Sequence, residues 1–367
     1  MTLPFLATTA VGIVSALARR LPFLPWWISY TDVWKFFRVA SLPGWPYAHI
    51  SLEYPPLIGV FIRSAGVLGG TQWGYYLMSI AGLTLCAAVT AYVLFNMIAP
   101  DRRSRVWLFF IFAPTLVLFL AMNWDAVAVM FATLALYAVS RNRYVPAALW
   151  IALGASAKLY PLLFLPFVLL AEKTWMGRTK IAGAFAAAWA VINVPFMIAN
   201  FEGWSYFLTF NQLRHANFDS LWTFLRFIEP AITPATVSGI SLTLFAIAYL
   251  AILIAFRGRN VIVSSFLATL AFILTNKVFS PQYLLWLLPF FALLPVFNKK
   301  EFYTLEVANI LIFFSILRWL DSVRGIGYIS NAYLYLSLSL VVLRHILLAV
   351  SAVRGVRLAR RPANSAL

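Results

Sequence analysis

The sequence alternates between long apolar runs that are almost free of charge and short segments that hold most of the charged residues. Charged residues make up 11% of the chain and hydrophobic residues 63%, whereas a soluble domain carries about 25% charged residues. About 17–25 apolar residues are enough for a helix to cross the hydrocarbon core of a bilayer. The pattern therefore predicts an all-α, polytopic membrane protein and argues against an ordinary soluble enzyme.

The apolar runs predict a bundle of about 12 spans within one domain, residues 1–367. Residues 57–70 are interrupted by Arg63 and are expected to lie at the membrane interface. The other runs lie near 3–18, 74–98, 106–122, 125–140, 144–157, 159–171, 181–200, 236–256, 260–275, 282–297, 303–317 and 331–352. Two of these are short, 144–157 and 159–171, so a re-entrant pair around Lys158 is an alternative to two full spans.

The connecting segments fall into two classes. One class is short and basic, and it includes the tail 353–367; by the positive-inside rule it faces the cytoplasm, as do both termini of this cell-membrane protein. The other class holds most of the acidic residues and faces outward. It comprises mainly a first external loop, 19–73, with juxtamembrane helices, and a long external loop, 201–235. Topology thus accounts for the net charge of +17, and a nucleic-acid partner is not expected.

The sequence lacks the residue patterns that several common kinds of functional site require. The single cysteine, Cys86, lies inside an apolar run and excludes an intrachain disulfide. The sequence has no HExxH motif, no histidine pair at metal-ligand spacing and no glycine-rich phosphate loop. It also lacks a serine nucleophile elbow. We therefore expect neither a metal nor another cofactor.

Two acidic residues stand out in the first external loop. Asp32 follows the first apolar run within an aromatic segment, and Glu53 precedes Tyr54 and two prolines. A carboxylate at a membrane boundary is costly unless it is solvated or paired, so such residues are candidates for function. Asp32 could act as a general base towards a hydroxyl group, or it could balance its basic neighbours. Glu53 and Tyr54 could bind a polyol, or they could form a membrane-entry turn.

Basic residues at the outer ends of the spans are candidates for binding an anion. Arg19 and Arg20 are adjacent and could hold a phosphate through two guanidinium groups, while Arg214 and His215 form a second such pair. Lys158 is a lone cation between two short runs and calls for a negatively charged partner. Snorkelling to the interface is the alternative for these side chains.

Further polar residues fall at external turns. Asn123 and Asp125 lie between two runs, where Asp125 could cap the following helix or point into an external cavity. Lys277, Gln282 and Tyr283 lie around the segment Ser280-Pro281 and could face the same cavity. We expect Asp32, Lys158, Arg214 and Lys277 to converge on one external cavity if the chain is an enzyme.

Six stretches in this order resemble the GT-C superfamily of integral membrane glycosyltransferases. They look most similar to mannosyltransferases that use a polyprenyl or dolichyl phosphate mannose, of the phosphoinositol-mannoside type and of the type that adds the first mannose to glycosylphosphatidylinositol anchors. The stretches are Arg20–Trp34, Glu53–Leu57, Asn123–Asp125, Ala157–Pro161, Arg214–Ser220 and Asn276–Pro289.

The resemblance implies an inverting transfer of a hexose, with mannose as the expected sugar, from the lipid phosphate to a hydroxyl group of a lipid or glycan. It implies that Asp32 is the catalytic base. Trp34 occupies the place of the second acid in a DxD pattern, which argues against a metal. The donor phosphate would meet Arg214 and Lys277 first, then Lys158, Arg19 and Arg20. The resemblance also allows a small membrane partner subunit.

Two other functions fit the pattern less well. A transporter or lipid flippase more often carries charges at mid-span and two matching halves, whereas the rare acids here fall at span ends on one side and no clear repeat is present. A non-catalytic membrane scaffold would leave Asp32, Lys158 and Lys277 without a role.

Overall fold

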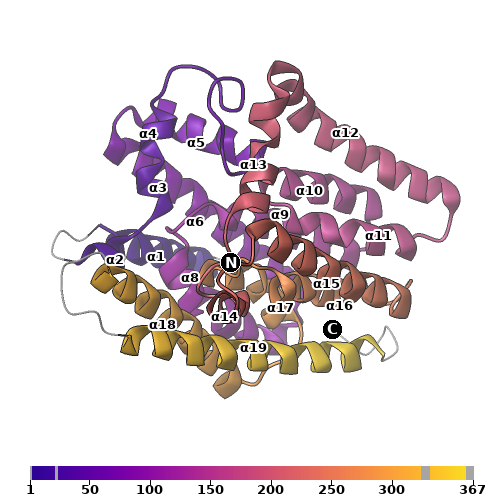
Figure 1. Ribbon diagram of the computed structural model, residues 1–367. Helices are drawn as coiled ribbons and strands as arrows, with labels where there is room; N and C mark the ends of the chain where they lie inside the picture. Colours follow the sequence, from indigo (N-terminus) through magenta and orange to yellow (C-terminus); the bar gives the residue numbers. More distant parts are fainter. Residues whose placement is uncertain (1, 21–23, 324–330, 361–367) are drawn as a thin grey trace.

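The computed structural model describes residues 2–20, 24–323 and 331–360, and these residues form a bundle of helices (Figure 1). The described residues contain no β-strand, apart from one isolated bridge between Pro46 and Ile50. The prediction of an all-α chain is therefore confirmed. Residues 361–367 of the predicted tail and 21–23 of the predicted first external loop lie outside the described residues.

The helices follow the apolar runs closely. The α-helices are α1 Thr2–Ala18, α2 Trp26–Ser29, α3 Asp32–Lys35, α4 Phe37–Ala40, α5 Pro56–Gly69, α6 Gln72–Met97, α7 Ser104–Val106, α8 Pro114–Phe119, α9 Asp125–Ser140, α10 Tyr144–Ala157, α11 Leu165–Ala171, α12 Trp175–Ala199, α13 Phe201–Leu213, α14 Trp222–Ile228, α15 Pro234–Ala255, α16 Val261–Thr275, α17 Leu288–Leu293, α18 Lys299–Val323 and α19 Ala332–Ala359. Short 3₁₀ or π segments are η1 Pro100–Arg102, η2 Trp107–Ile111, η3 Tyr160–Phe164 and η4 Pro281–Trp286.

Polar caps mark where several long helices begin. The side chains of Thr71, Thr174 and Asn200 each accept a hydrogen bond from the backbone N–H three residues later, at α6, α12 and α13. Thr233 and Asn260 do the same at α15 and α16. These caps satisfy N–H groups that have no partner inside the helix, so short polar sequences between apolar runs are sufficient to fix the helix starts.

Five of the described helices are long and apolar enough to cross a membrane: α6, α12, α15, α18 and α19. Seven shorter apolar helical stretches of 10–17 residues accompany them. Most residues of α12 and α15 are apolar but not buried in the protein, which fits helices that face lipid. The chain is thus an integral membrane protein, while the number of about 12 spans stays a prediction.

The structure refines three of the predicted segments. Residues 201–235 are not an irregular loop, because α13 and α14 occupy much of this range. The run 106–122 is not one regular helix: it breaks at Ala113, which is extended before Pro114. Lys158 is also extended and separates α10 from η3, so the two short runs around it meet at a break in the helix.

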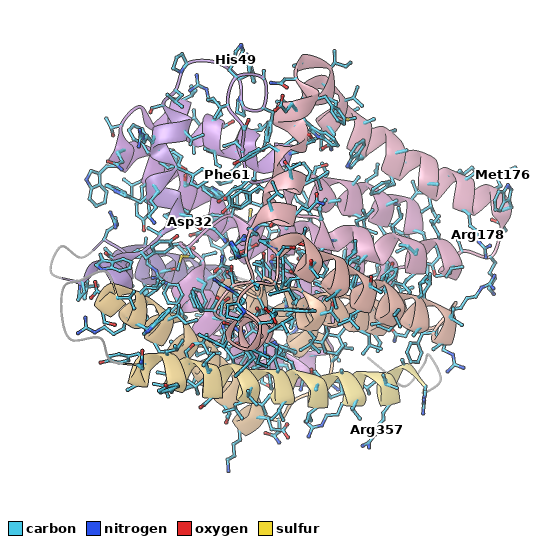
Figure 2. The ribbon with its side chains drawn as sticks, in the orientation of Figure 1. Asp32, His49, Phe61, Met176, Arg178 and Arg357 are labelled. Atoms are coloured by element: carbon cyan, nitrogen blue, oxygen red, sulfur yellow. The ribbon has the colours of Figure 1, made fainter. Side chains whose placement is uncertain are left out.

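Hydrogen bonds to backbone carbonyls attach the aromatic loop, which is the part of the first external loop around Asp32, to the bundle. The Thr31 hydroxyl donates a hydrogen bond to the Ala121 carbonyl over 2.5 Å, and the Asp32 N–H donates to the Met122 carbonyl over 2.9 Å. The start of α3 is therefore held against the connection between α8 and α9. Figure 2 shows Asp32 on the side of the molecule away from Arg178 and Arg357, the side opposite two of the predicted cytoplasmic segments.

Candidate active site

A cavity of about 970 Å³ opens between the aromatic loop and the helices that follow it. Its walls come from segments far apart in the sequence: Tyr30 and Asp32, 53–55, 122–123, 158–160, parts of 207–219, 235–245 and 272–286, and 313–317. The size is within the range of pockets that enclose small organic ligands. The structure brings Asp32, Lys158, Arg214 and Lys277 to this one cavity.

Asp32 is half-buried at the cavity wall, and its carboxylate is held by a neighbouring tyrosine. The Tyr30 hydroxyl donates a hydrogen bond to Asp32 Oδ1 over 2.9 Å, and the Lys35 ammonium lies 3.7 Å from the centre of the Tyr30 ring. Burial raises the pKa of Asp32, while the Tyr30 hydrogen bond and the charges of Lys35 and Lys158 act in the opposite direction. The raised pKa suits a group that must accept a proton.

Glu53 and Tyr54 lie at the same wall. Burial and the charge of Asp32 raise the pKa of Glu53, whereas the charges of Arg214 and Lys158 lower it. The Tyr54 ring is buried, packs edge-on against Trp124 at 5.2 Å between centroids, and lies 5.0 Å from the Lys158 ammonium. Both predicted residues therefore line the cavity.

Asp125 does not line the cavity; it holds a residue that does. Its Oδ1 atom is 2.9 Å from Lys158 Nζ and accepts a hydrogen bond from Trp286 Nε1 over 3.0 Å. The Asp125 side chain is fully buried. Asn123, rather than Asp125, provides the local cap, because its Oδ1 accepts the Asp125 N–H over 3.0 Å. Asp125 thus pairs with Lys158 and fixes where this cation lies.

Aromatic rings form one part of the cavity wall. Trp286 stacks against Tyr283, with centroids 4.2 Å apart, and against Tyr160 at 4.4 Å. Both stacks are nearly parallel, with interplanar angles of 18° and 9°. Gln282 and Tyr283 face the cavity, as the sequence predicted.

A polar network surrounds Arg214. Its Nη2 donates to Asn217 Oδ1 over 3.0 Å, and Asn217 Nδ2 donates to Ser280 Oγ over 3.1 Å. The Asn217 N–H also donates to the Lys277 carbonyl over 3.1 Å. Two turns, one after α13 and one after α16, are thereby joined at the cavity.

Lys277 is mainly bound to carbonyl groups. Its ammonium donates to the Gln212 carbonyl over 2.9 Å and to the Arg214 carbonyl over 2.5 Å. Burial and the charge of Arg214 lower the pKa of Lys277 to about 8. This side chain lines the cavity, but its hydrogen bonds make it foremost a link between the two turns.

Three predicted phosphate-binding residues lie away from the cavity lining. Arg19 is buried and donates to the Leu118 carbonyl over 2.7 Å, and Arg20 stacks over the Trp34 ring at 4.3 Å. His215 is exposed at the surface. Arg19 and Arg20 thus hold the first external loop in place in this structure, because their guanidinium groups are directed at backbone carbonyls and rings.

Among the polar residues that line the cavity, sequence reasoning did not select Tyr30, Asn217, Asp219 and Ser280. Asp219 is buried, and burial raises its pKa to about 6 although the charge of Arg344 lowers it. All four lie in stretches that carried the resemblance, two to four residues from a selected position. Adjacency to a selected acid or cation was the signal that could have identified them.

Part of the cavity wall is apolar. Phe207, Leu208 and Phe210 of α13 line it together with Leu242 and Phe245 of α15. These helices carry many exposed apolar side chains. The cavity wall thus combines charged groups with apolar side chains, and Phe210 lies close to Arg214, with 5.5 Å between the ring centre and the guanidinium carbon.

Comparison with protein families shows that residues 52–281 match glycosyltransferase family 87. The match covers well over half of the chain and includes Glu53, Lys158, Arg214 and Lys277. The chain belongs to glycosyltransferase family 87. This confirms the glycosyltransferase part of the recognition made from the six stretches, while no curated protein matches the sequence.

Solved structures that are similar to this chain share little sequence identity with it. One is the oligosaccharyltransferase of Archaeoglobus fulgidus in the apo form, with 12% identity and a TM-score of 0.38; the match covers 97% of this chain and 56% of that one. Another is ArnT from Cupriavidus metallidurans bound to undecaprenyl phosphate, with 14% identity, a TM-score of 0.43, and 98% and 78% covered. The chain spans little more than half the length of the oligosaccharyltransferase.

No group of three or more histidine, cysteine, aspartate or glutamate side chains gathers as metal ligands within the described part of this family 87 protein. Metal independence stays a prediction, which rests on Trp34 at the place of a second acid.

The buried pair of Asp125 and Lys158 leads to a stability prediction. Asp125→Asn leaves the Lys158 cation without its charged partner, so we expect the free energy of unfolding to fall by about 3–5 kcal/mol. Thermal denaturation in detergent measures this change. Asp101→Asn, which alters an exposed pair with Arg102, is the matched control and should leave the midpoint unchanged. Equal midpoints for both variants would contradict the role of the buried pair.

Proposed function

We propose that this family 87 protein is a GT-C-type transferase that moves a hexose from a polyprenyl or dolichyl phosphate to an acceptor hydroxyl group. Mannose is the expected sugar. The observation that carries the proposal is one cavity whose wall holds a carboxylate, several cations and apolar side chains of α13 and α15. Such a cavity suits a substrate with a sugar phosphate head and an isoprenoid tail.

The reaction needs few groups from the protein. The acceptor oxygen forms a bond to the anomeric carbon of the hexose as the bond from that carbon to the phosphate oxygen breaks. Asp32 takes the proton from the acceptor hydroxyl, and the lipid phosphate leaves with the electron pair of the broken bond. One displacement inverts the anomeric configuration, and Glu53 is assigned to the acceptor or sugar, not to nucleophilic attack.

The cations of the cavity wall would bind the leaving phosphate and stabilise its negative charge. Arg214 is the first candidate because it is half-buried, lines the cavity and is oriented by Asn217. Lys158 is the second, since Asp125 fixes its ammonium at the cavity wall. Positive groups fixed in advance stabilise the charge that develops on a leaving oxygen without further rearrangement. Lys277 contributes mainly by holding the turn that carries Arg214.

The apolar part of the cavity wall suits the isoprenoid chain. Phe210, Leu242 and Phe245 lie where a lipid tail could pass between α13 and α15 towards the bilayer. Charge distribution favours an extracytoplasmic site with both termini in the cytoplasm. The acceptor is a membrane lipid or a glycan, and neither a metal nor a nucleic acid takes part in this proposal.

Asp32→Asn tests the proposed base. The amide cannot accept the proton, so we expect kcat to fall at least about 100-fold with an unchanged thermal midpoint. The measurement is transfer from a radiolabelled polyprenyl phosphate mannose in proteoliposomes. Full activity of the variant would remove Asp32 as the base, and solute uptake without glycosyl transfer would support a transporter. Asp101→Asn, on the exposed surface, is the control.

Tyr30→Phe tests how the base is tuned. The lost hydrogen bond stabilised the ionised carboxylate, so the pKa of Asp32 should rise further. A base works only when ionised, and its activity falls as the pH drops through its pKa. The acidic limb of the kcat/KM profile should therefore move upward by about one pH unit.

Tyr303→Phe is the matched control for this profile. Its hydroxyl donates to the Leu108 carbonyl over 3.1 Å, and the residue does not line the cavity. The control should keep the wild-type pH profile. An acidic limb of Tyr30→Phe at the wild-type position would contradict the link between Tyr30 and the base.

A further inference from the structure

A fully buried arginine lies in the last helix and has no role in the chemistry proposed above. Arg344 belongs to α19 and has no exposed surface. A guanidinium group inside a membrane-spanning helix costs free energy unless other groups satisfy it. The family match ends at residue 281, so it does not include this arginine, and the proposed chemistry does not use it.

The guanidinium group of Arg344 contacts three different parts of the chain. Nη1 donates to Asn309 Oδ1 of α18 over 2.9 Å. Nη2 donates to the carbonyl groups of Asp219 and of Phe279, the latter over 3.4 Å, and the guanidinium carbon lies 3.6 Å from the centre of the Phe279 ring. Within the described residues Arg344 forms no salt bridge, so backbone carbonyls and an amide are its main partners.

These two carbonyl groups belong to the two turns that line the cavity. Asp219 follows Arg214 and Asn217, and Phe279 precedes Ser280. Asn309 reinforces the same place, because its Nδ2 donates to the Pro281 carbonyl over 2.8 Å. The turns are also joined on the cavity side by Asn217 and Ser280. One guanidinium group, which does not itself line the cavity, thus links the turns that carry the proposed phosphate-binding residues. We call this link the Arg344 brace.

We propose that Arg344 is a positioning residue for the donor: it holds the turn of Arg214 and the turn of Ser280 at a fixed separation, so that a lipid phosphate meets both. This inference rests on the proposed function. It also makes α18 and α19 part of the binding unit for the donor, although they contribute few residues to the cavity wall. Figure 1 shows these two helices side by side along one edge of the bundle.

The chemistry of arginine explains why this side chain is suited to the task. Its planar group presents donors in a fixed fork, so it can bond carbonyls of two turns and an amide at the same time. A lysine has one ammonium on a flexible stem and cannot reproduce this geometry. Loss of the brace should affect the phosphate-binding side of the cavity and spare Asp32, which is anchored to Met122 instead.

The chain offers a matched control on the same pair of helices. Arg354 is ten positions further along α19, and it also joins α18, through Glu301 at 2.6 and 2.7 Å and the Val296 carbonyl at 2.9 Å. Arg354 does not line the cavity or contact its turns. Arg344→Gln and Arg354→Gln therefore both remove an arginine link between α18 and α19, but only the first link reaches the turns.

The experiment compares both variants with the wild type in proteoliposomes, with donor and acceptor concentrations varied separately. We expect Arg344→Gln to raise the KM for the donor about tenfold or more and to leave the KM for the acceptor unchanged. Arg354→Gln should keep both KM values. A merely structural role would lower the active fraction, and thus kcat, without this separation of the two KM values.

Binding of polyprenyl phosphate to the purified protein, with polyprenol as the comparison lipid, separates failure of this inference from failure of the proposed function. If the wild type binds polyprenyl phosphate but transfers no sugar, the transferase proposal fails, and weaker binding by Arg344→Gln still supports the brace. Equal binding and equal donor KM for both arginine variants would overturn it. If Arg344→Gln does not fold, Arg344→Lys is measured instead, and a wild-type donor KM for that variant overturns the inference.

Discussion

The constraint behind this structure is that backbone polar groups within a bilayer must find partners inside the protein. Irregular backbone is therefore tolerated at membrane depth only where it is buried in protein or lines a cavity. Helix breaks occur at Ala113, at Lys158 and between Asn276 and Pro281. The last two line the cavity directly. The first is followed by the short helix α8, whose end leads to Met122 and Asn123 in the same wall.

The same constraint governs the charged side chains. A charge removed from water needs a partner that is held in place, and three cations near the cavity illustrate this. Lys158 is paired with the carboxylate of Asp125, Lys277 with carbonyl groups, and Arg344 with two carbonyls and an amide. Because these partners come from different helices, each ion also fixes the position of one cavity segment relative to another.

The sequence was sufficient to predict the helical class, most helix positions and several residues that line the cavity, among them Asp32, Lys158 and Arg214. Hydropathy identifies a helix because burial in lipid depends on the composition of one continuous segment. It could not show that Asp125 is enclosed behind Lys158, nor that Arg19 points to the carbonyl of Leu118. The direction of a side chain depends on neighbours that are distant in sequence. Tyr30 was not selected for the same reason, because only the folded structure shows that its hydroxyl group donates a hydrogen bond to Asp32.

By itself, the sequence determined that the chain resides in a membrane and that its motifs are those of a glycosyltransferase. These properties follow from local composition and from the order of short motifs along the chain. Tertiary structure alone decided which polar groups share a cavity and which ones support it from behind. Asp32, Lys158 and Arg214 are brought together across more than 180 positions, and Arg344 reaches their surroundings from α19. Only packing between helices can set such distances, because no local pattern encodes the separation of residues on different elements.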